Sequence, residues 1–277
     1  MRDWQTDFLK GEHLLAEGRT EEALAELKTA LEKVSASNRG VVLDAMGRAE
    51  VHAGRYRNAK RHFEAAVQLW TTPGRERAAA LSNAGWTYLA LEEYGHAEEM
   101  FQQALAIVSD EPALWQNIGQ ARFRLRRRRE AEECLRKALS LASPEQVPSI
   151  VSDLAVLFEA KRQYAKAAET LREAIGKTGP GCERGRMRAN LGVVLWKLRQ
   201  PSESAAQFRL ALVEVESAVG PWHPYIANIL VDYQEVLGKT GHKAEAASAA
   251  ARAAAIRSSF ARQVPDRRHA VDWRDLK

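Results

Sequence analysis

The chain has 277 residues, of which 28% are charged and 45% hydrophobic, and its formal net charge is +5 at pH 7. No apolar run approaches the roughly eighteen residues of a membrane-spanning helix, and the first ten residues lack a signal-peptide pattern. This composition argues against a membrane protein and predicts a soluble, cytoplasmic one. The two cysteines, Cys134 and Cys182, have no metal-ligand or redox spacing, and we expect free, inert thiols.

In chain order, the hydrophobic pattern predicts seven pairs of helices and no strand. Glycines fall in the turns within pairs, as at Gly18 and Gly54, and prolines fall between pairs, as at Pro73 and Pro112. The predicted pairs are 3–17 with 20–34, 39–53 with 56–70, 75–91 with 94–108, 112–125 with 128–141, 146–160 with 164–176, 185–198 with 202–217, and 223–239 with 242–260.

The same frame of residues returns in every pair. A first small residue is followed by a second small one twelve positions later, a bulky apolar residue four beyond that, and an alanine three further on. Small residues let two helices approach closely, and the bulky residue fills the space beside that contact. The final alanines are Ala30, Ala66, Ala104, Ala138, Ala174, Ala211 and Ala253.

This spacing of small, bulky and alanine positions resembles that of tetratricopeptide repeats over nearly the whole chain. The resemblance implies an all-α, right-handed superhelical solenoid of about seven antiparallel helix-turn-helix hairpins. We expect one domain over residues 1–263 and a tail over 264–277; a non-repeat bundle would not explain seven coincident frames. The entrance His223-Pro224 with Ala227, and the longer last interval, resemble the kinesin-light-chain type of repeat.

We expect no enzymatic activity, catalytic residue, metal or cofactor. The seven histidines lie in different repeats without metal-ligand spacing, and no nucleophile elbow occurs. The glycine-rich segment 176–185 could be taken for a phosphate loop, but no strand precedes it and no Lys-Ser/Thr pair follows, so we interpret it as a helix cap and turn.

The resemblance places ligand binding on an inner, concave face lined by the first helix of each pair. Five consecutive repeats carry Asn or Asp two positions before the first small residue, and an asparagine amide can pair with both polar groups of a peptide unit. This resembles the asparagine ladders of O-GlcNAc transferase and kinesin-light-chain solenoids; the alternative is that the amides serve local backbone groups. The candidate residues for a peptide groove are Asn83, Trp86, Asn117, Gln120, Arg124, Asp153, Val156, Asn190, Val193 and Lys197.

A run of arginines surrounds the predicted turn of the fourth hairpin. It could be an edge site for phosphate or carboxylate groups of a partner, or a solvated basic turn. We do not expect nucleic acid to be the ligand, because the patch is short and has few stacking aromatics. The candidate residues are Arg122, Arg126, Arg127, Arg128 and Arg129.

The sequence therefore predicts a non-enzymatic interaction module or scaffold that binds an extended protein segment. The alternatives are a phosphate- or nucleic-acid-binding regulator acting through the arginine turn, and a self-assembling structural subunit. We expect a monomer or weak homo-oligomer with a protein or peptide partner. In the tail, Trp273 is expected either to fold back on the last hairpin or to lie in a frayed end.

Overall fold

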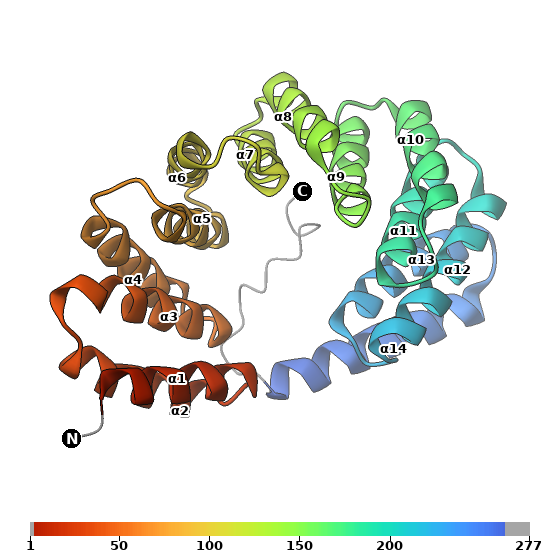
Figure 1. Cartoon of the computed structure of the whole chain (residues 1–277). Helices are drawn as coiled ribbons and strands as arrows, with labels where there is room; N and C mark the ends of the chain where they lie inside the picture. Colours follow the sequence, from red (N-terminus) through yellow and green to blue (C-terminus); the bar gives the residue numbers. More distant parts are fainter. Residues whose placement is uncertain (1–2, 264–277) are drawn as a thin grey trace. The chain divides into compact units, whose positions relative to one another are not determined.

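A computed structural model of the protein describes residues 3–263, which form fourteen α-helices and one short 3-10 helix with no strand in that range (Figure 1). The chain divides into two compact units, and the division falls between Cys134 and Leu135, inside one helix. The expected tail, including Trp273, lies outside the described residues.

The first unit contains three complete helical hairpins and the start of a fourth (Figure 1). Within each hairpin, two helices run antiparallel and are joined by a turn of three residues. The helices are α1 (Trp4–Ala16), α2 (Thr20–Lys33), α3 (Arg39–His52), α4 (Tyr56–Leu69), α5 (Arg75–Ala90), α6 (Tyr94–Ile107), α7 (Pro112–Arg124) and the beginning of α8 (Arg128–Leu141), with the 3-10 turn η1 (Ala36–Asn38) before α3.

The second unit contains the end of α8 and three further hairpins, built in the same way. Proline occupies the first turn of α9, α12 and α13, where its missing N–H is not needed by the helix. The helices are α9 (Val147–Ala160), α10 (Tyr164–Lys177), α11 (Cys182–Lys197), α12 (Pro201–Val219), α13 (Pro224–Lys239) and α14 (Lys243–Gln263).

All fourteen predicted helices are present in the described residues, with ends within three residues of those expected. The largest difference at a helix start is in α11, which begins at Cys182 and includes Gly185 rather than starting there. Gly185 is needed for packing, because a Cβ atom at this position would lie 2.6 Å from Cγ2 of Val215. The glycine-rich segment before α11 is a turn between helices, with Gly181 at a φ of 150°.

Contacts between the small and bulky positions hold the hairpins together. A Cβ atom on Gly47 would lie 2.5 Å from the ring of Phe63, and one on Gly85 would lie 2.6 Å from the ring of Phe101. The alanines and bulky residues of the frame are buried in both units; Phe63, Phe101 and Phe208 are among the largest fully buried side chains. The close approach of two helices therefore depends on the absence of a side chain at the glycine.

The last hairpin reaches the same packing with different residues. The frame predicts a bulky residue at position 250, where Ala250 stands, and a small one at 234, where Gln234 stands. Here Ile256 of α14 and Tyr233 of α13 are buried, and the ring centroid of Tyr233 lies 5.8 Å from that of Phe208. The apolar volume that Ala250 does not provide is thus supplied by neighbouring residues.

Each hairpin turn contains one residue in the left-handed region of the backbone. It lies seven residues after the first small residue and twelve before the final alanine of its repeat. Left-handed backbone costs about 1–2 kcal/mol for a residue with a Cβ atom, and little for glycine. The seven residues are Gly18, Gly54, Glu92, Arg126, Arg162, Arg199 and Gly241.

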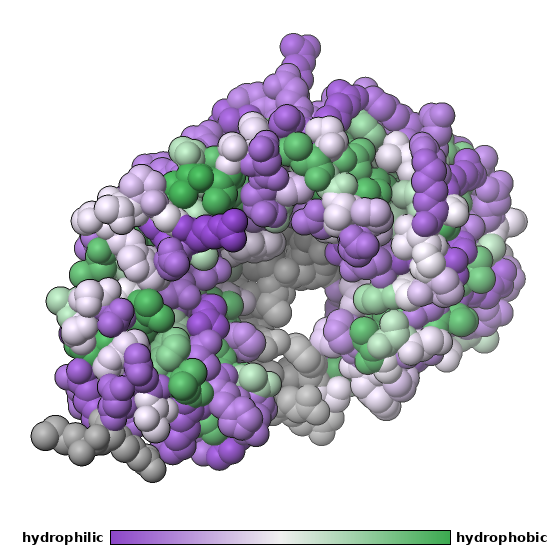
Figure 2. Space-filling model, viewed as in Figure 1, coloured by the Kyte–Doolittle hydropathy of each residue, from purple (hydrophilic) through white to green (hydrophobic). Residues whose placement is uncertain are grey.

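The described residues thus form an all-α helical repeat solenoid. On the face shown in Figure 2, hydrophobic residues form small separate patches among hydrophilic ones. None of the described helices is long and apolar enough to span a membrane. The assignment of residues 1–263 to one domain stays a prediction.

Candidate functional site

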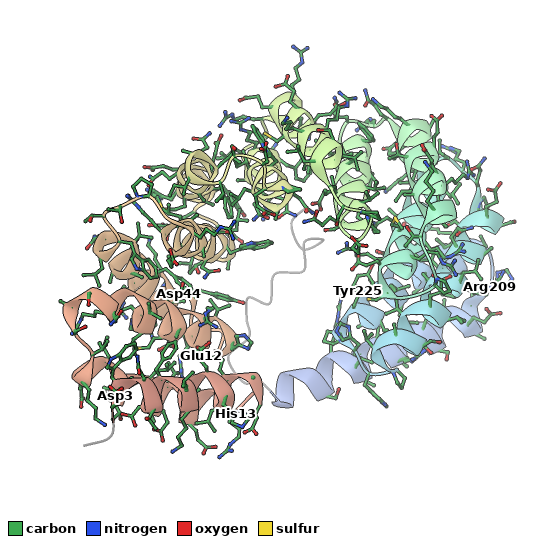
Figure 3. All side chains as sticks on the ribbon, in the orientation of Figure 1. Asp3, Glu12, His13, Asp44, Arg209 and Tyr225 are labelled. Atoms are coloured by element: carbon green, nitrogen blue, oxygen red, sulfur yellow. The ribbon has the colours of Figure 1, made fainter. Side chains whose placement is uncertain are left out.

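In the first unit, a chain of polar side chains crosses α1, α3 and α5. Both oxygens of Glu12 accept hydrogen bonds of 2.9 Å from the Arg48 guanidinium, whose Nε donates to Asp44 at 3.1 Å. The second oxygen of Asp44 accepts a 3.1 Å bond from Nδ2 of Asn83. Figure 3 labels Glu12 on α1 and Asp44 on α3. These bonds connect α1, α3 and α5, three consecutive first helices, and include the predicted groove residue Asn83.

Two large apolar side chains on the first helices of this unit are exposed. Leu9 on α1 is 65% exposed, and Trp86 on α5 is 50% exposed, although its indole makes an edge-to-face contact with Phe101 with ring centroids 6.5 Å apart. Trp86 follows Asn83 by three residues, which places the two on neighbouring positions of α5. The face therefore combines an oriented amide with an aromatic surface that water contacts.

Further candidates of this unit lie on α7. Asn117 is buried, and Gln120 is half-buried and makes an interaction of its own. The Arg124 guanidinium lies 4.8 Å from the ring centroid of Tyr94 and also donates to its hydroxyl oxygen. Arg124 of α7 is thus held in place by Tyr94 of α6, through a contact between the third and fourth hairpins.

In the second unit, the candidates differ in how much surface they offer. Asn190 on α11 is only 6% exposed, and its Nδ2 has no hydrogen-bond partner among the described residues. Asp153 on α9 is half-buried and has an interaction partner. Val156 and Val193 are half-buried, whereas Lys197 is exposed at the end of α11. Asn190 thus has a buried donor that none of the described residues satisfies.

The arginines around the turn between α7 and α8 fall into two groups. Arg122 and Arg127 both donate to Glu98 of α6, at 2.7 and 2.6 Å, and Arg127 also pairs with Glu130. Glu98 itself is buried, so these two guanidiniums neutralise a carboxylate inside the structure. The other three, Arg126, Arg128 and Arg129, are exposed and make no ion pair with the described residues.

One residue of the face was not singled out from the sequence. Glu12 stands one position after the first small residue of its repeat, as Arg48 does in the next, and the two form an ion pair. Their opposite charges at the same frame position, 36 residues apart, are a signal that was available in the sequence. In the second unit, Trp196 Nε1 likewise donates to Glu235 of the next first helix at 3.2 Å.

Few titratable groups in the described residues have strongly perturbed acidities. Burial raises the pKa of the Cys134 thiol, which accepts a bond from Arg122, and burial also raises the pKa of Cys182. Burial lowers the pKa of His62. No group of three or more potential metal ligands occurs in residues 3–263.

The architecture and the repeated frame define the class of protein: a helical repeat protein made of stacked hairpins. Residues 39–110 match one family model described as Tetratricopeptide repeat, and residues 117–181 and 153–219 match a second with the same description. Together these matches cover more than half of the chain, which therefore belongs to the tetratricopeptide repeat family. They end at residue 219, so the kinesin-light-chain character of the last hairpin stays a prediction.

Solved structures agree on the fold. A tetratricopeptide repeat protein from Parabacteroides merdae has a TM-score of 0.74 at 16% identity, with 91% of this chain and 93% of that one covered. The apo form of RapI gives 0.70 at 13% identity, covering 94% and 99%. PilF of Pseudomonas aeruginosa gives 0.61 at 18% identity, covering 85% and 97%. No curated protein matches the chain by sequence.

Tetratricopeptide repeat proteins are in general non-enzymatic scaffolds that contact other proteins, and the matched models indicate no catalytic family.

Proposed function

We propose that the chain is a cytoplasmic protein-binding module that holds an extended segment of a partner on the first helices of its hairpins. The observation that carries the proposal is the pairing of Trp86, half exposed, with Asn83, whose amide is oriented by Asp44. Exposed aromatic surface beside fixed hydrogen-bonding groups is characteristic of binding sites.

The oriented amide suits a peptide backbone. One hydrogen of the Asn83 Nδ2 group is used by Asp44, which leaves the second hydrogen and the carbonyl oxygen of the side chain. A peptide unit needs one donor and one acceptor, so Asn83 retains both. Because Asp44 is held by Arg48, the amide loses little conformational freedom when a ligand binds.

A selection from a random peptide library, displayed on phage and panned against the protein, tests the proposal. We expect enriched peptides whose binding is weakened at least tenfold by Trp86→Ala and about threefold to tenfold by Asn83→Ala. Trp222 is a matched control, since it is 61% exposed in the loop between α12 and α13, and Trp222→Ala is expected to leave binding unchanged. Enriched peptides that bind the Trp86 and Asn83 variants as well as the original protein would contradict this site.

A further inference from the structure

Two arginines of the second unit occupy backbone positions that favour glycine. Arg162 has a φ of 58° in the turn between α9 and α10, and Arg199 has a φ of 59° in the turn between α11 and α12. Both are exposed; their backbone N–H groups bond to the carbonyl oxygens of Glu159 and Trp196, whereas neither guanidinium makes a hydrogen bond or ion pair with the described residues. In the following hairpin, Gly241 takes the same position. The fold therefore gains no visible contact from these two side chains and would accept glycine in their place.

Arginines that follow the left-handed turn residue by one position, in contrast, form ion pairs. Arg19 pairs with Glu22, Arg55 pairs with Glu21 and Glu50, and Arg127 pairs with Glu98. The arginines at this second turn position thus form ion pairs within the fold. The unpaired side chains of Arg162 and Arg199, at strained backbone positions, therefore indicate a role other than stabilising the fold.

The rest of the turn edge of the second unit is also basic. Lys197 at the end of α11 is exposed, as are Lys239 and Lys243 on either side of the turn between α13 and α14. Of the nearby acids, Glu203 pairs with Arg172 at 3.0 Å, Glu159 has an interaction partner as well, and Glu245 in the first turn of α14 is exposed, one carboxylate beside two lysines. The turns of three consecutive hairpins therefore present an excess of positive charge that the unit itself does not neutralise.

We propose that this edge binds an extended acidic segment of a partner protein, with Arg162 and Arg199 as its principal contacts. Since α9 contacts α11 and α11 contacts α13, equivalent turns follow one another at the distance of packed helices, about 8–10 Å. A chain in the extended polyproline II conformation has three residues per turn and rises about 3.1 Å per residue, so carboxylates on every third residue share one face and match this repeat. Nucleic acid, with a charge about every 1.7 Å in a duplex and every 3.4 Å along one strand, fits such sparse cations less well. Its principal contacts, Arg162 and Arg199, are not among the candidate residues of the peptide groove.

The proposal is tested with a fluorescent ten-residue peptide that carries Glu at every third position and Gly or Ser elsewhere. A peptide of the same composition with its glutamates together at one end serves as the comparison. In low-salt fluorescence anisotropy, we expect the periodic peptide to bind more tightly than the clustered one. The double variant Arg162→Gln/Arg199→Gln is expected to weaken its binding about fivefold, because two charge-assisted contacts are lost.

Two further variants separate a binding role from net charge and from stability. Lys177→Gln/Arg257→Gln removes the same charge from α10 and α14, away from the turns, and is expected to bind the periodic peptide normally. Arg162→Gly/Arg199→Gly should lose binding while its urea midpoint does not fall, because glycine suits the left-handed backbone.

Three results would overturn the proposal: equal loss of binding in the Lys177/Arg257 control, no binding of either peptide, or a lower urea midpoint for the glycine variant. A ten-nucleotide single-stranded DNA that binds more tightly than the periodic peptide, and loses binding in the Arg162/Arg199 variant, would replace the acidic segment with nucleic acid.

Discussion

The hydroxyl of Ser204 on α12 donates a 2.7 Å hydrogen bond to the carbonyl oxygen of Gly192 on α11 at a fully buried position. The other repeats have alanine at the position of Ser204. A hydroxyl fits there because the carbonyl oxygen of the facing helix accepts its hydrogen, so no buried donor is left unpaired.

Ser204→Ala should therefore change the free energy of unfolding by less than about 1 kcal/mol, since the hydroxyl and its bond are removed together. Ser204→Val should cost about 1–3 kcal/mol, because two methyl groups would enter a closed contact between helices. Urea unfolding followed by circular dichroism measures both. Equal stability of the Val and Ala variants would show that α11 and α12 can move apart without loss.

Gly85→Ala should destabilise the third hairpin by about 1–3 kcal/mol, because the added Cβ atom would lie 2.6 Å from the ring of Phe101. Gly176→Ala is the control: this glycine lies in α10, and no atom comes within 4 Å of an added Cβ. Since alanine favours helix more than glycine, the control should be unchanged or up to about 1 kcal/mol more stable. Thermal unfolding of the two variants compares them directly, and a Gly85 variant as stable as the control would contradict the packing.

Glu92→Gly should stabilise the turn between α5 and α6 by up to about 1 kcal/mol. Glu92 has a φ of 61°, and relief of the left-handed strain exceeds the entropy that glycine adds to the unfolded chain. Gly54→Ala, in the equivalent turn between α3 and α4, should act in the opposite direction by about 1 kcal/mol. Guanidinium titration measures the pair, and a destabilised Glu92→Gly variant would show that its carboxylate has a role in folding.

Glu98→Gln should cost about 1–3 kcal/mol, because Arg122 and Arg127 would lose a shared carboxylate that is only 7% exposed. The adjacent Glu99 is exposed, so Glu99→Gln should change stability by less than about 0.5 kcal/mol. The difference between the two urea midpoints is the measurement. A Glu98 variant as stable as the Glu99 control would mean that the two arginines find water or another acid without loss.

Stability should fall as the pH is lowered from about 7 toward 5, in part because of His62. Burial is the main cause that lowers its pKa in the folded protein, so the unfolded chain, with a pKa near 6.5, binds the proton first. His62→Gln should reduce this pH dependence, whereas the exposed His52 replaced by Gln should retain it. Urea midpoints at pH 5 and pH 7.5 provide the test, and an unchanged slope in the His62 variant would contradict the assignment.

The helices and their pairing could be predicted from the sequence because both depend on short-range spacing. Gly47 and Phe63 are sixteen residues apart in one hairpin, and the same separation of small and bulky residues returns throughout the chain. In the last hairpin the bulky frame position holds Ala250, and the buried Ile256 and Tyr233 stand outside the frame.

The side-chain contacts between hairpins were harder to predict. The arginines near α8 look alike in the sequence, yet Arg127 reaches Glu98 while Arg126 points to solvent. Likewise, nothing in the spacing indicates that Asp44 holds the amide of Asn83. Long charged and polar side chains have several rotamers, and only the neighbouring helices decide which carboxylate each one meets.

The constant distance between the first small residue and the left-handed turn residue bears on how the chain can be engineered. From Gly85 to Glu92 and from Gly192 to Arg199 the interval is seven residues, so length differences between repeats lie outside this interval, as in α12, which ends at Val219. The connections from one hairpin to the next, such as 178–181, are natural points for inserting a reporter loop or a second domain. A single residue inserted inside α6, ahead of Ala97, would instead rotate the alanines that follow it by about 100° about the helix axis and turn them away from their glycine partner.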